Sequence, residues 1–238
     1  MAAFLFLVTL LALIAHVLAN TEKTIFLGPD PNAASVPEDL SALHLDTLAP
    51  DAWSLRAQLR AEFPSPEHPQ GAATWIVLDG LTPGQRYEVR VCWPATQPTA
   101  FALKTYAPST VYSTPALLSS LQDYSASRQP SNTTAPRKHG PNSGSLLLLQ
   151  ILAAADFFTT DASLMTLPPP VDADVILDPY LANVLPRSLA GTVVYLVVVG
   201  AVAYLGLARG ARWVIRELVR SSHGHGKVED EGRRKKVQ

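Results

Sequence analysis

The sequence predicts a mainly β protein, an antiparallel β-sandwich followed by one C-terminal transmembrane α-helix. Three observations carry this prediction. Between Thr74 and Trp93, a short apolar run and a turn are followed by residues 86–91, in which apolar and charged residues alternate with the period of a half-buried strand. Ser188 to Ala208 form a run of 21 residues without a charge, which matches a hydrocarbon core of about 30 Å. Met1 to Ala19 form a second uncharged run.

The segment from Thr74 to Trp93 contains two strands and a turn. Residues 75–78 (Trp-Ile-Val-Leu) indicate a short buried strand, and residues 80–84 (Gly-Leu-Thr-Pro-Gly) supply turn chemistry. A second strand follows, in which apolar and charged residues alternate: Tyr87, Val89 and Val91 against Arg86, Glu88 and Arg90. A period of two predicts that the apolar set faces a core.

The turn and the tyrosine after it resemble the E–F corner of fibronectin type III domains. Leu81-Thr-Pro-Gly is followed by Tyr87-x-Val-x-Val. In that corner the tyrosine hydroxyl bonds back to the backbone of the turn. The resemblance implies a fibronectin III or Ig-like sandwich in which Leu81 and Tyr87 form a structural tyrosine corner.

Further strands are expected at residues 25–27, 53–59 and 101–105. That gives five strands, and a missing one is expected within residues 146–158, where an apolar run of about 10 residues is too short to span a membrane. Residues 123–145 are rich in Ser, Thr, Pro and Asn and predict a mobile loop. This loop carries the sequon Asn132-Thr-Thr, which predicts N-glycosylation at Asn132.

The two uncharged runs set the predicted topology. The first ends in Val17-Leu18-Ala19 and predicts a signal peptide cleaved after Ala19. Four arginines (Arg209, Arg212, Arg216, Arg220) follow the second run, but only Arg187 directly precedes it. The positive-inside rule therefore places the C-terminus in the cytosol. The predicted parts are a signal peptide (1–19), a lumenal sandwich domain (20–167), a juxtamembrane linker (168–187), a transmembrane helix (188–208) and a cytosolic basic tail (209–238).

The last residues of the tail suggest an address. Lys235 and Lys236 stand fourth and third from the C-terminus, where they resemble the dilysine retrieval signal of endoplasmic reticulum membrane proteins. Such a signal is read by a receptor rather than acting as an anchor. We therefore expect residence in the endoplasmic reticulum membrane and binding of coat proteins through the dilysine end.

Composition excludes several classes of function. The formal net charge of −1 argues against binding to nucleic acid. The single cysteine, Cys92, excludes a disulfide framework and a multi-thiolate zinc site. No Gly-x-Ser-x-Gly, phosphate-binding glycine loop or His-Glu-x-x-His is present. Asp172-Ala-Asp174 has the form of a metal-binding Asp-x-Asp, but no nucleotide-binding βαβ unit accompanies it. No catalytic residue, metal site or cofactor is predicted.

Two stretches resemble the fungal GPI mannosyltransferase II co-activator family. They are Thr24-Ile-Phe-Leu-Gly-Pro29 and Asp174-Val-Ile-Leu-Asp-Pro-Tyr-Leu-Ala-Asn-Val-Leu-Pro-Arg-Ser-Leu189. The resemblance implies a small, signal-bearing, single-span subunit of the endoplasmic reticulum. Its partner would be the multi-span enzyme that adds the second mannose to the GPI anchor precursor. The family supplies no catalytic residues to carry over.

The non-repetitive sequence of residues 174–189, directly before and at the start of the predicted span, is more complex than a simple tether requires. We therefore expect it to bind and to stabilise or activate the catalytic subunit, together with the small residues of the span. The predicted partner-binding residues are Asp178, Pro179, Tyr180, Asn183, Pro186 and Arg187. Two alternatives share the layout: a cargo receptor of the early secretory pathway, and a sandwich-type adhesion or receptor module. The first lacks a lumenal heptad repeat, and the retrieval signal argues against the second.

Overall fold

A computed structural model describes residues 20–30, 40–128 and 145–234. The chain divides into two compact units, Met1–Arg187 and Ser188–Gln238. The first unit contains all the strands, and the second is one long helix, α5 (Ala190–Arg234).

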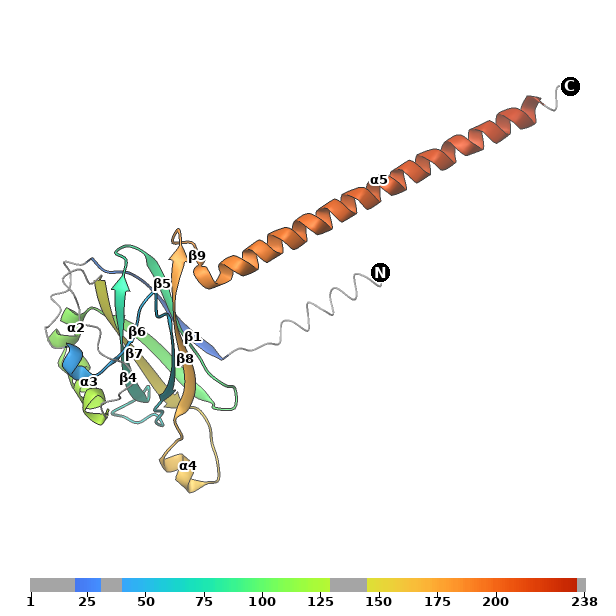
Figure 1. Cartoon of the computed structure of the whole chain (residues 1–238). Helices are drawn as coiled ribbons and strands as arrows, with labels where there is room; N and C mark the ends of the chain where they lie inside the picture. Colours follow the sequence, from blue (N-terminus) through green and yellow to red (C-terminus); the bar gives the residue numbers. More distant parts are fainter. Residues whose placement is uncertain (1–19, 31–39, 129–144, 235–238) are drawn as a thin grey trace. The chain divides into compact units, whose positions relative to one another are not determined.

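Four strands and a short hairpin arm form the first sheet, which we call sheet A. Its order is β1 (Thr21–Leu27), β5 (Arg86–Cys92), β8 (Val171–Leu181) and β3 (Ser54–Leu59), and every neighbouring pair is antiparallel. The two-residue strand β9 (Leu185–Pro186) folds back onto the end of β8. Strand β8 is therefore central, and β1 and β3 are the edges (Figure 1).

The second sheet, sheet B, has the order β2 (Asp46–Leu48), β4 (Ala72–Leu81), β7 (Ser145–Ala155) and β6 (Thr99–Tyr106). The pairs β4–β7 and β6–β7 are antiparallel. The pair β2–β4 is parallel and only three residues long. Consecutive strands β4 and β5 lie in different sheets, so the turn between them carries the chain from sheet B to sheet A.

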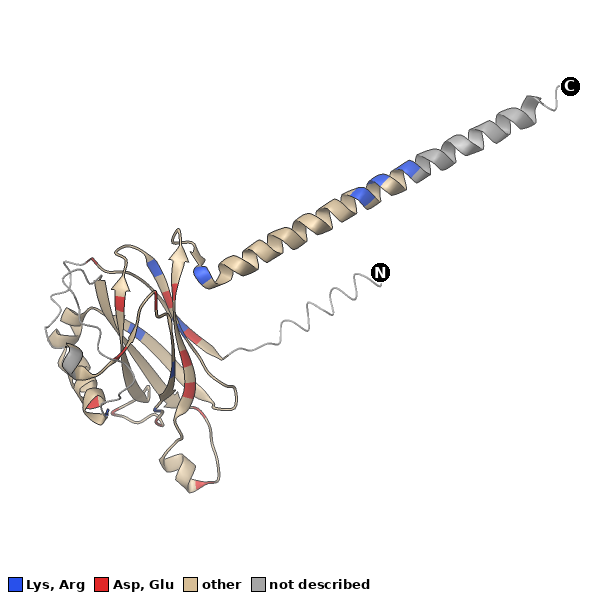
Figure 2. Cartoon of the chain, in the orientation of Figure 1, with Lys and Arg blue, Asp and Glu red and all other residues tan. Residues whose placement is uncertain are grey.

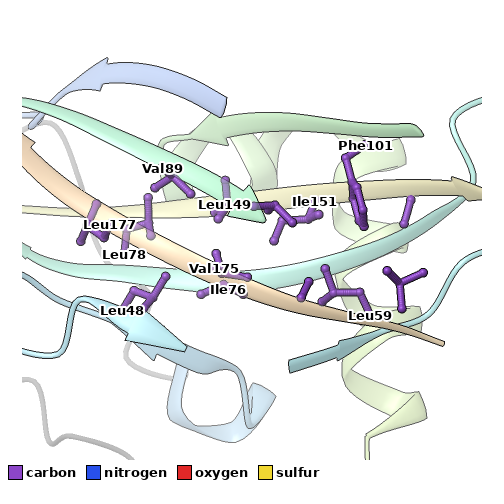
Figure 3. Packing of buried hydrophobic residues seen from close by; sticks show 14 of the residues in the cluster. Leu48, Leu59, Ile76, Leu78, Val89, Phe101, Leu149, Ile151, Val175 and Leu177 are labelled. Carbon is purple, nitrogen blue, oxygen red and sulfur yellow. The ribbon is translucent and has the colours of Figure 1, made fainter. Parts of the chain in front are cut away.

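The two sheets share one hydrophobic core (Figure 3). Period-two alternation in β5 and β8 sends one set of side chains inward, among them Val89, Val175 and Leu177, all fully buried. From sheet B they meet side chains such as Leu78 and Leu149, also fully buried. Burying an aliphatic side chain of this size contributes about 1.5–3 kcal/mol. This shared core is what holds the two sheets together.

Helices cover the other face of sheet B (Figure 1). They are η2 (Leu40–Leu43), α2 (Pro108–Ser113) and α3 (Pro115–Ser127), and α2 and α3 each have a proline in the first turn. A second core lies beneath them, where Val111 and Leu121 pack with Trp75 of β4. The indole Nε1 of Trp75 donates to Ser120 Oγ at 3.2 Å. Beyond β7, a short helix α4 (Ala162–Thr166) precedes β8, and η3 (Arg187–Leu189) precedes α5.

The mainly β architecture is confirmed, as two sheets and one apolar C-terminal helix. Each of the five predicted strand segments overlaps an observed strand, and the missing strand expected within residues 146–158 is β7. The predicted antiparallel arrangement is wrong for β2, which pairs with β4 in parallel. A fibronectin III or Ig-like topology stays a prediction.

Two predicted segments need correction. The linker predicted at residues 168–187 is wrong over most of its length, because residues 171–181 form the central strand of sheet A and residues 185–186 pair with it. Its alternating Val171, Ala173, Val175 and Leu177 bury one face of that strand. The loop predicted at residues 123–145 begins too early, because α3 continues to Ser127. Residues 129–144 of that loop lie outside the described residues.

Candidate partner-binding surface

The outer face of sheet A carries the side chains that alternate with its core set. On β5 these include Glu88 and Arg90, and on β8 they include Asp178 and Tyr180. Glu88 lies directly opposite Asp178 in the β5–β8 register. Although both carboxylates belong to the outer set, Glu88 is only 4% exposed and Asp178 only 5%. Two acids buried side by side need counter-charges, because isolated buried charges are strongly unfavourable.

The counter-charges come from the edge strand β1 and from β5 itself. Lys23 Nζ of the edge strand β1 lies 3.2 Å from Glu88 Oε2. Arg90 Nη1 lies 3.6 Å from Glu88 Oε1 and 3.9 Å from Asp178 Oδ2. Two acids and two bases thus form one ion-pair cluster across β1, β5 and β8. Removing a single partner from such a cluster leaves a buried charge uncompensated.

Tyr180 closes the cluster. Its hydroxyl donates to Glu88 Oε2 at 3.3 Å, and the residue is only 7% exposed. Burial raises the pKa of the Tyr180 hydroxyl, and the negative charge and hydrogen bond of Glu88 raise it further. The hydroxyl therefore stays protonated and can act as the donor. The guanidinium of Arg86 lies 5.8 Å from the centroid of the Tyr180 ring, within cation–π range.

Asn183 joins two turns at the same end of the sheet. It occupies the turn between β8 and β9 with φ 58°, a left-handed conformation that asparagine tolerates better than most residues. Its Oδ1 accepts from the backbone N–H of Arg86 at 2.7 Å, and its Nδ2 donates to the carbonyl of Gly84 at 2.9 Å. The β8–β9 hairpin is therefore fixed to the β4–β5 turn.

The structure divides the six predicted partner-binding residues into three groups. Asp178, Tyr180 and Asn183 make the internal contacts described above, so much of their bonding capacity serves the fold. Pro179 and Pro186 are half-buried in β8 and β9, where Pro186 lies opposite Tyr180. Arg187 is exposed in η3. The first five lie together in sheet A and its hairpin.

Sequence reasoning missed the exposed apolar residues at this end of the body. Ile25 and Leu27 of β1 are 50% and 57% exposed, and Leu181 and Val184 of the hairpin are 45% and 79% exposed. The sequence does contain a signal that Ile25 and Leu27 are exposed. Phe26 stands between two large apolar residues in a strand, and it packs toward the core, so its neighbours face outward. We call Ile25, Leu27, Leu181 and Val184 the apolar patch.

The predicted tyrosine corner residues flank the β4–β5 turn, because Leu81 ends β4 and Tyr87 lies near the start of β5. The backbone N–H of Thr82 donates to the Tyr87 hydroxyl at 2.9 Å, and that hydroxyl donates to Gln85 Oε1, also at 2.9 Å. The ring is fully buried and stacks on Phe26, with 5.8 Å between centroids. Leu81 is 1% exposed and belongs to the same core.

The remaining predicted sites cannot be placed. Ala19, Asn132, Lys235 and Lys236 all lie outside the described residues.

The Asp-x-Asp pair of β8 is engaged with β3. Asp174 receives two hydrogen bonds from the Arg56 guanidinium, at 2.8 and 2.9 Å, and Asp172 receives one from Gln58 Nε2 at 3.1 Å. Among the residues that the structure describes, no group of three or more His, Cys, Asp and Glu is placed to hold a metal ion.

A groove of about 1100 Å³ lies between β3, the beginning of β4 and α3. Much of its charge is already paired: Arg128 with Asp46 at 2.7 Å, and Arg60 with Glu62 at 2.6 Å. None of the predicted site residues lines it.

Helix α5 carries the second surface available to a partner. The helix over Arg187–Arg216 is long and apolar enough to cross a membrane, since an 18-residue window within it has a mean hydropathy of 2.1, and none of that window is buried. Figure 2 shows that no charged residue stands between Arg187 and the arginines that begin at Arg209. Gly191, Gly200 and Gly206 each have open space at the position of a Cβ atom. A neighbouring helix could therefore approach closely at these points.

Comparison with known proteins gives one match. A family model described as GPI-mannosyltransferase II co-activator matches residues 10–117. This range includes Thr24–Pro29, one of the two stretches that carry the resemblance, together with β1 to β6 and most of the helical layer. The second stretch, residues 174–189, lies outside it. No curated protein and no solved structure matches the chain.

Proposed function

We propose that the chain is a non-catalytic subunit of the enzyme that adds the second mannose to the GPI precursor, because residues 10–117 match the GPI-mannosyltransferase II co-activator family model. It binds the multi-span catalytic subunit and stabilises or activates it. The family match is the single observation that carries this proposal. It favours the accessory subunit over the cargo receptor and the adhesion module. We assign no catalytic residue and no cofactor.

We further propose a type I topology in the endoplasmic reticulum membrane. The signal peptide is cleaved after Ala19, residues 188–208 span the membrane, and the basic tail from residue 209 lies in the cytosol. The position of the first strand supports this cleavage site, because β1 begins at Thr21, two residues after Ala19. Lys235 and Lys236 recruit coat proteins for retrieval.

Sugar maturation at Asn132 tests this localisation. Wild-type chain should carry a high-mannose glycan that endoglycosidase H removes. The double variant Lys235→Ser, Lys236→Ser should acquire a processed, resistant glycan. An endoglycosidase-H-sensitive glycan on that variant would argue against the dilysine signal, and an unglycosylated wild type would argue against a lumenal position for residue 132.

Two surfaces support binding to a polytopic subunit. No part of the apolar window in α5 is buried, and this helix has small residues where another helix can approach. The outer face of sheet A has Ile25 and Leu27 half-exposed above the ion-pair cluster of Glu88 and Asp178. Exposed apolar side chains beside fixed charges are typical of interaction surfaces. We therefore propose that the catalytic subunit contacts the span through its membrane helices and β1 through its lumenal loops.

A test of partner binding has to leave strand β8 intact. Replacing residues 174–205 as a block would remove the central strand of sheet A and unfold the lumenal domain. The two surfaces are better tested separately, by replacing residues 188–208 with an unrelated span and by the substitution Leu27→Lys. Leu167→Lys is a matched control, because Leu167 is also exposed (74%) but lies before β8, beside α4.

The readout is co-purification of the catalytic subunit from mild detergent, followed by mannosyltransferase activity of the recovered complex. We expect the span replacement and Leu27→Lys each to reduce recovery, and Leu167→Lys to leave it unchanged. Full recovery with Leu27→Lys would refute a contact at β1. Wild-type chain that recovers no mannosyltransferase would refute the proposed function itself.

A further inference from the structure

The apolar patch has two parts, and the part on the β8–β9 hairpin is close in sequence to the span. Leu181 ends β8, Val184 stands in the turn, and the stretch long enough to span begins at Arg187. The turn is closed by the backbone N–H of Val184, which donates to the Leu181 carbonyl at 3.1 Å. Val184 is 79% exposed, the largest exposure of the four residues in the apolar patch.

Chain length limits how far Val184 can be from the membrane. Arg187 is three positions after Val184, and a fully extended chain covers at most about 3.6 Å per residue, or about 11 Å in all. The polar layer on each side of the hydrocarbon core is about 5–8 Å thick. With the span entering the hydrocarbon core at residue 188, as proposed above, Val184 is therefore within or next to the headgroup layer.

The chemistry around the turn suits that layer. Two apolar residues, Leu181 and Val184, project from the hairpin, and two exposed arginines, Arg86 and Arg187, flank them. Aliphatic side chains that enter the acyl boundary beside guanidinium groups at phosphate depth are the pattern of an interfacial anchor. An exposed valine at the tip of a hairpin has no role in the core of the body.

The hairpin is also rigidly attached to the lumenal body. Asn183 bonds to Arg86 and Gly84 in the β4–β5 turn, and Gln85 Nε2 donates to the Tyr180 carbonyl at 3.2 Å. A force on the hairpin tip is therefore transmitted to sheet A rather than absorbed by a loose loop.

We propose that the β8–β9 hairpin is an interfacial membrane anchor, in which Leu181 and Val184 insert into the lumenal leaflet and hold the β domain against the bilayer. The lipid surface, not the catalytic subunit, is the occupant of this part of the apolar patch. The inference rests on α5 spanning the membrane but not on the identity of the partner. Ile25 and Leu27 remain available to that partner.

The test measures lipid contact in purified full-length chain reconstituted alone into nanodiscs. Cys92 is replaced by serine, and a single cysteine is introduced as Val184→Cys, or as Leu181→Cys at a second position, and labelled with an environment-sensitive fluorophore. Quenching is measured with lipids that carry a nitroxide near the headgroup. Phe158→Cys is the control in the body, because Phe158 is 85% exposed and lies in the connection between β7 and β8. Strand β8 separates the two ends by about 33 Å, at about 3.3 Å per residue.

We expect residues 181 and 184 to be quenched at least about twofold more strongly than residue 158. A fluorophore at Val198→Cys, within the uncharged stretch, reports the span itself. Quenching at residue 184 no greater than at residue 158, with residue 198 in contact with lipid acyl chains, would overturn the anchor and leave the proposed function standing. Absence of lipid contact at residue 198 would overturn the anchor together with the membrane topology.

Discussion

The hydroxyl of Tyr87 is the most informative single group to remove from the β domain. The substitution Tyr87→Phe deletes one acceptor, for the Thr82 N–H at 2.9 Å, and one donor, to Gln85 Oε1 at 2.9 Å. It leaves the fully buried ring and its stack on Phe26 in place. The change in stability therefore reports the hydrogen bonds of the β4–β5 turn without a cavity.

The magnitude follows from two bonds. Each intramolecular hydrogen bond contributes about 0.5–1.5 kcal/mol net, so losing both costs about 1–3 kcal/mol. In a domain of this size 1 kcal/mol shifts Tm by about 2–4 °C. We expect a central loss of about 2 kcal/mol, which lowers Tm by about 4–8 °C. The assay is thermal unfolding of the full-length chain in detergent, followed by intrinsic tryptophan fluorescence.

Tyr106→Phe is the matched control. Tyr106 also packs against an aromatic ring, that of Trp75 at 6.1 Å, and its hydroxyl bonds to no other described residue. Removing that hydroxyl should shift Tm by less than about 1 °C. Equal shifts for the two variants would refute the argument, because they would mean that the turn gains nothing from its tyrosine.

Two further predictions concern the same sheet. Asn183→Gly keeps the left-handed backbone at low cost but loses both side-chain hydrogen bonds, whereas Asn183→Ala loses the same bonds and also adds backbone strain. The Tm should therefore be highest for the wild type, lower for the glycine variant and lowest for the alanine variant. An alanine variant as stable as the glycine variant would contradict the argument from backbone strain. The hydrogen bonds from Arg56 lower the pKa of the Asp174 carboxyl in the folded protein. This exposed pair therefore stabilises the fold at pH values above about 3.9, the pKa of an aspartate in the unfolded chain. The contribution is lost as the pH falls through the lower pKa of the folded state. Asp174→Asn should accordingly destabilise the domain slightly at about pH 6 and hardly at all at about pH 2, as measured by the difference in Tm, and a gap that widens on acidification would contradict this sign.

The local sequence pattern was sufficient to predict a strand where apolar and polar residues alternate along a half-buried segment. Tyr87, Val89 and Val91 indicated β5 and its inward face, and all three are fully buried. The same signal was present in β8, where Val171 and Ala173 begin an alternating series. It was overlooked because prolines precede the segment and acidic residues alternate within it, which gives the composition of an extended linker. The structure shows that those acids bond across to β3, at Arg56 and Gln58.

Non-local pairing was the part that the sequence could not supply. Glu88 and Asp178 are 90 positions apart, and neither is unusual in its own strand. Their burial comes from the β5–β8 register and from Lys23 on a third strand. The three-residue strand β2 is similarly invisible, because its pairing with β4 is parallel and too short to leave a period. Helix α3 had a weak signal in Leu117 and Leu121, masked by its serines.

The central position of β8 has a consequence for biosynthesis. Strand β3 ends at Leu59, and its only partner in sheet A begins at Val171, roughly 110 residues later. At about 5–20 residues per second, β3 waits roughly 5–20 s for that partner to be made. Because β8 ends within ten residues of α5, its synthesis is followed almost at once by that of the span. In the proposed topology, closure of the β domain and integration of the span into the bilayer are therefore nearly simultaneous events, and until then an unpaired strand edge is exposed to chaperones.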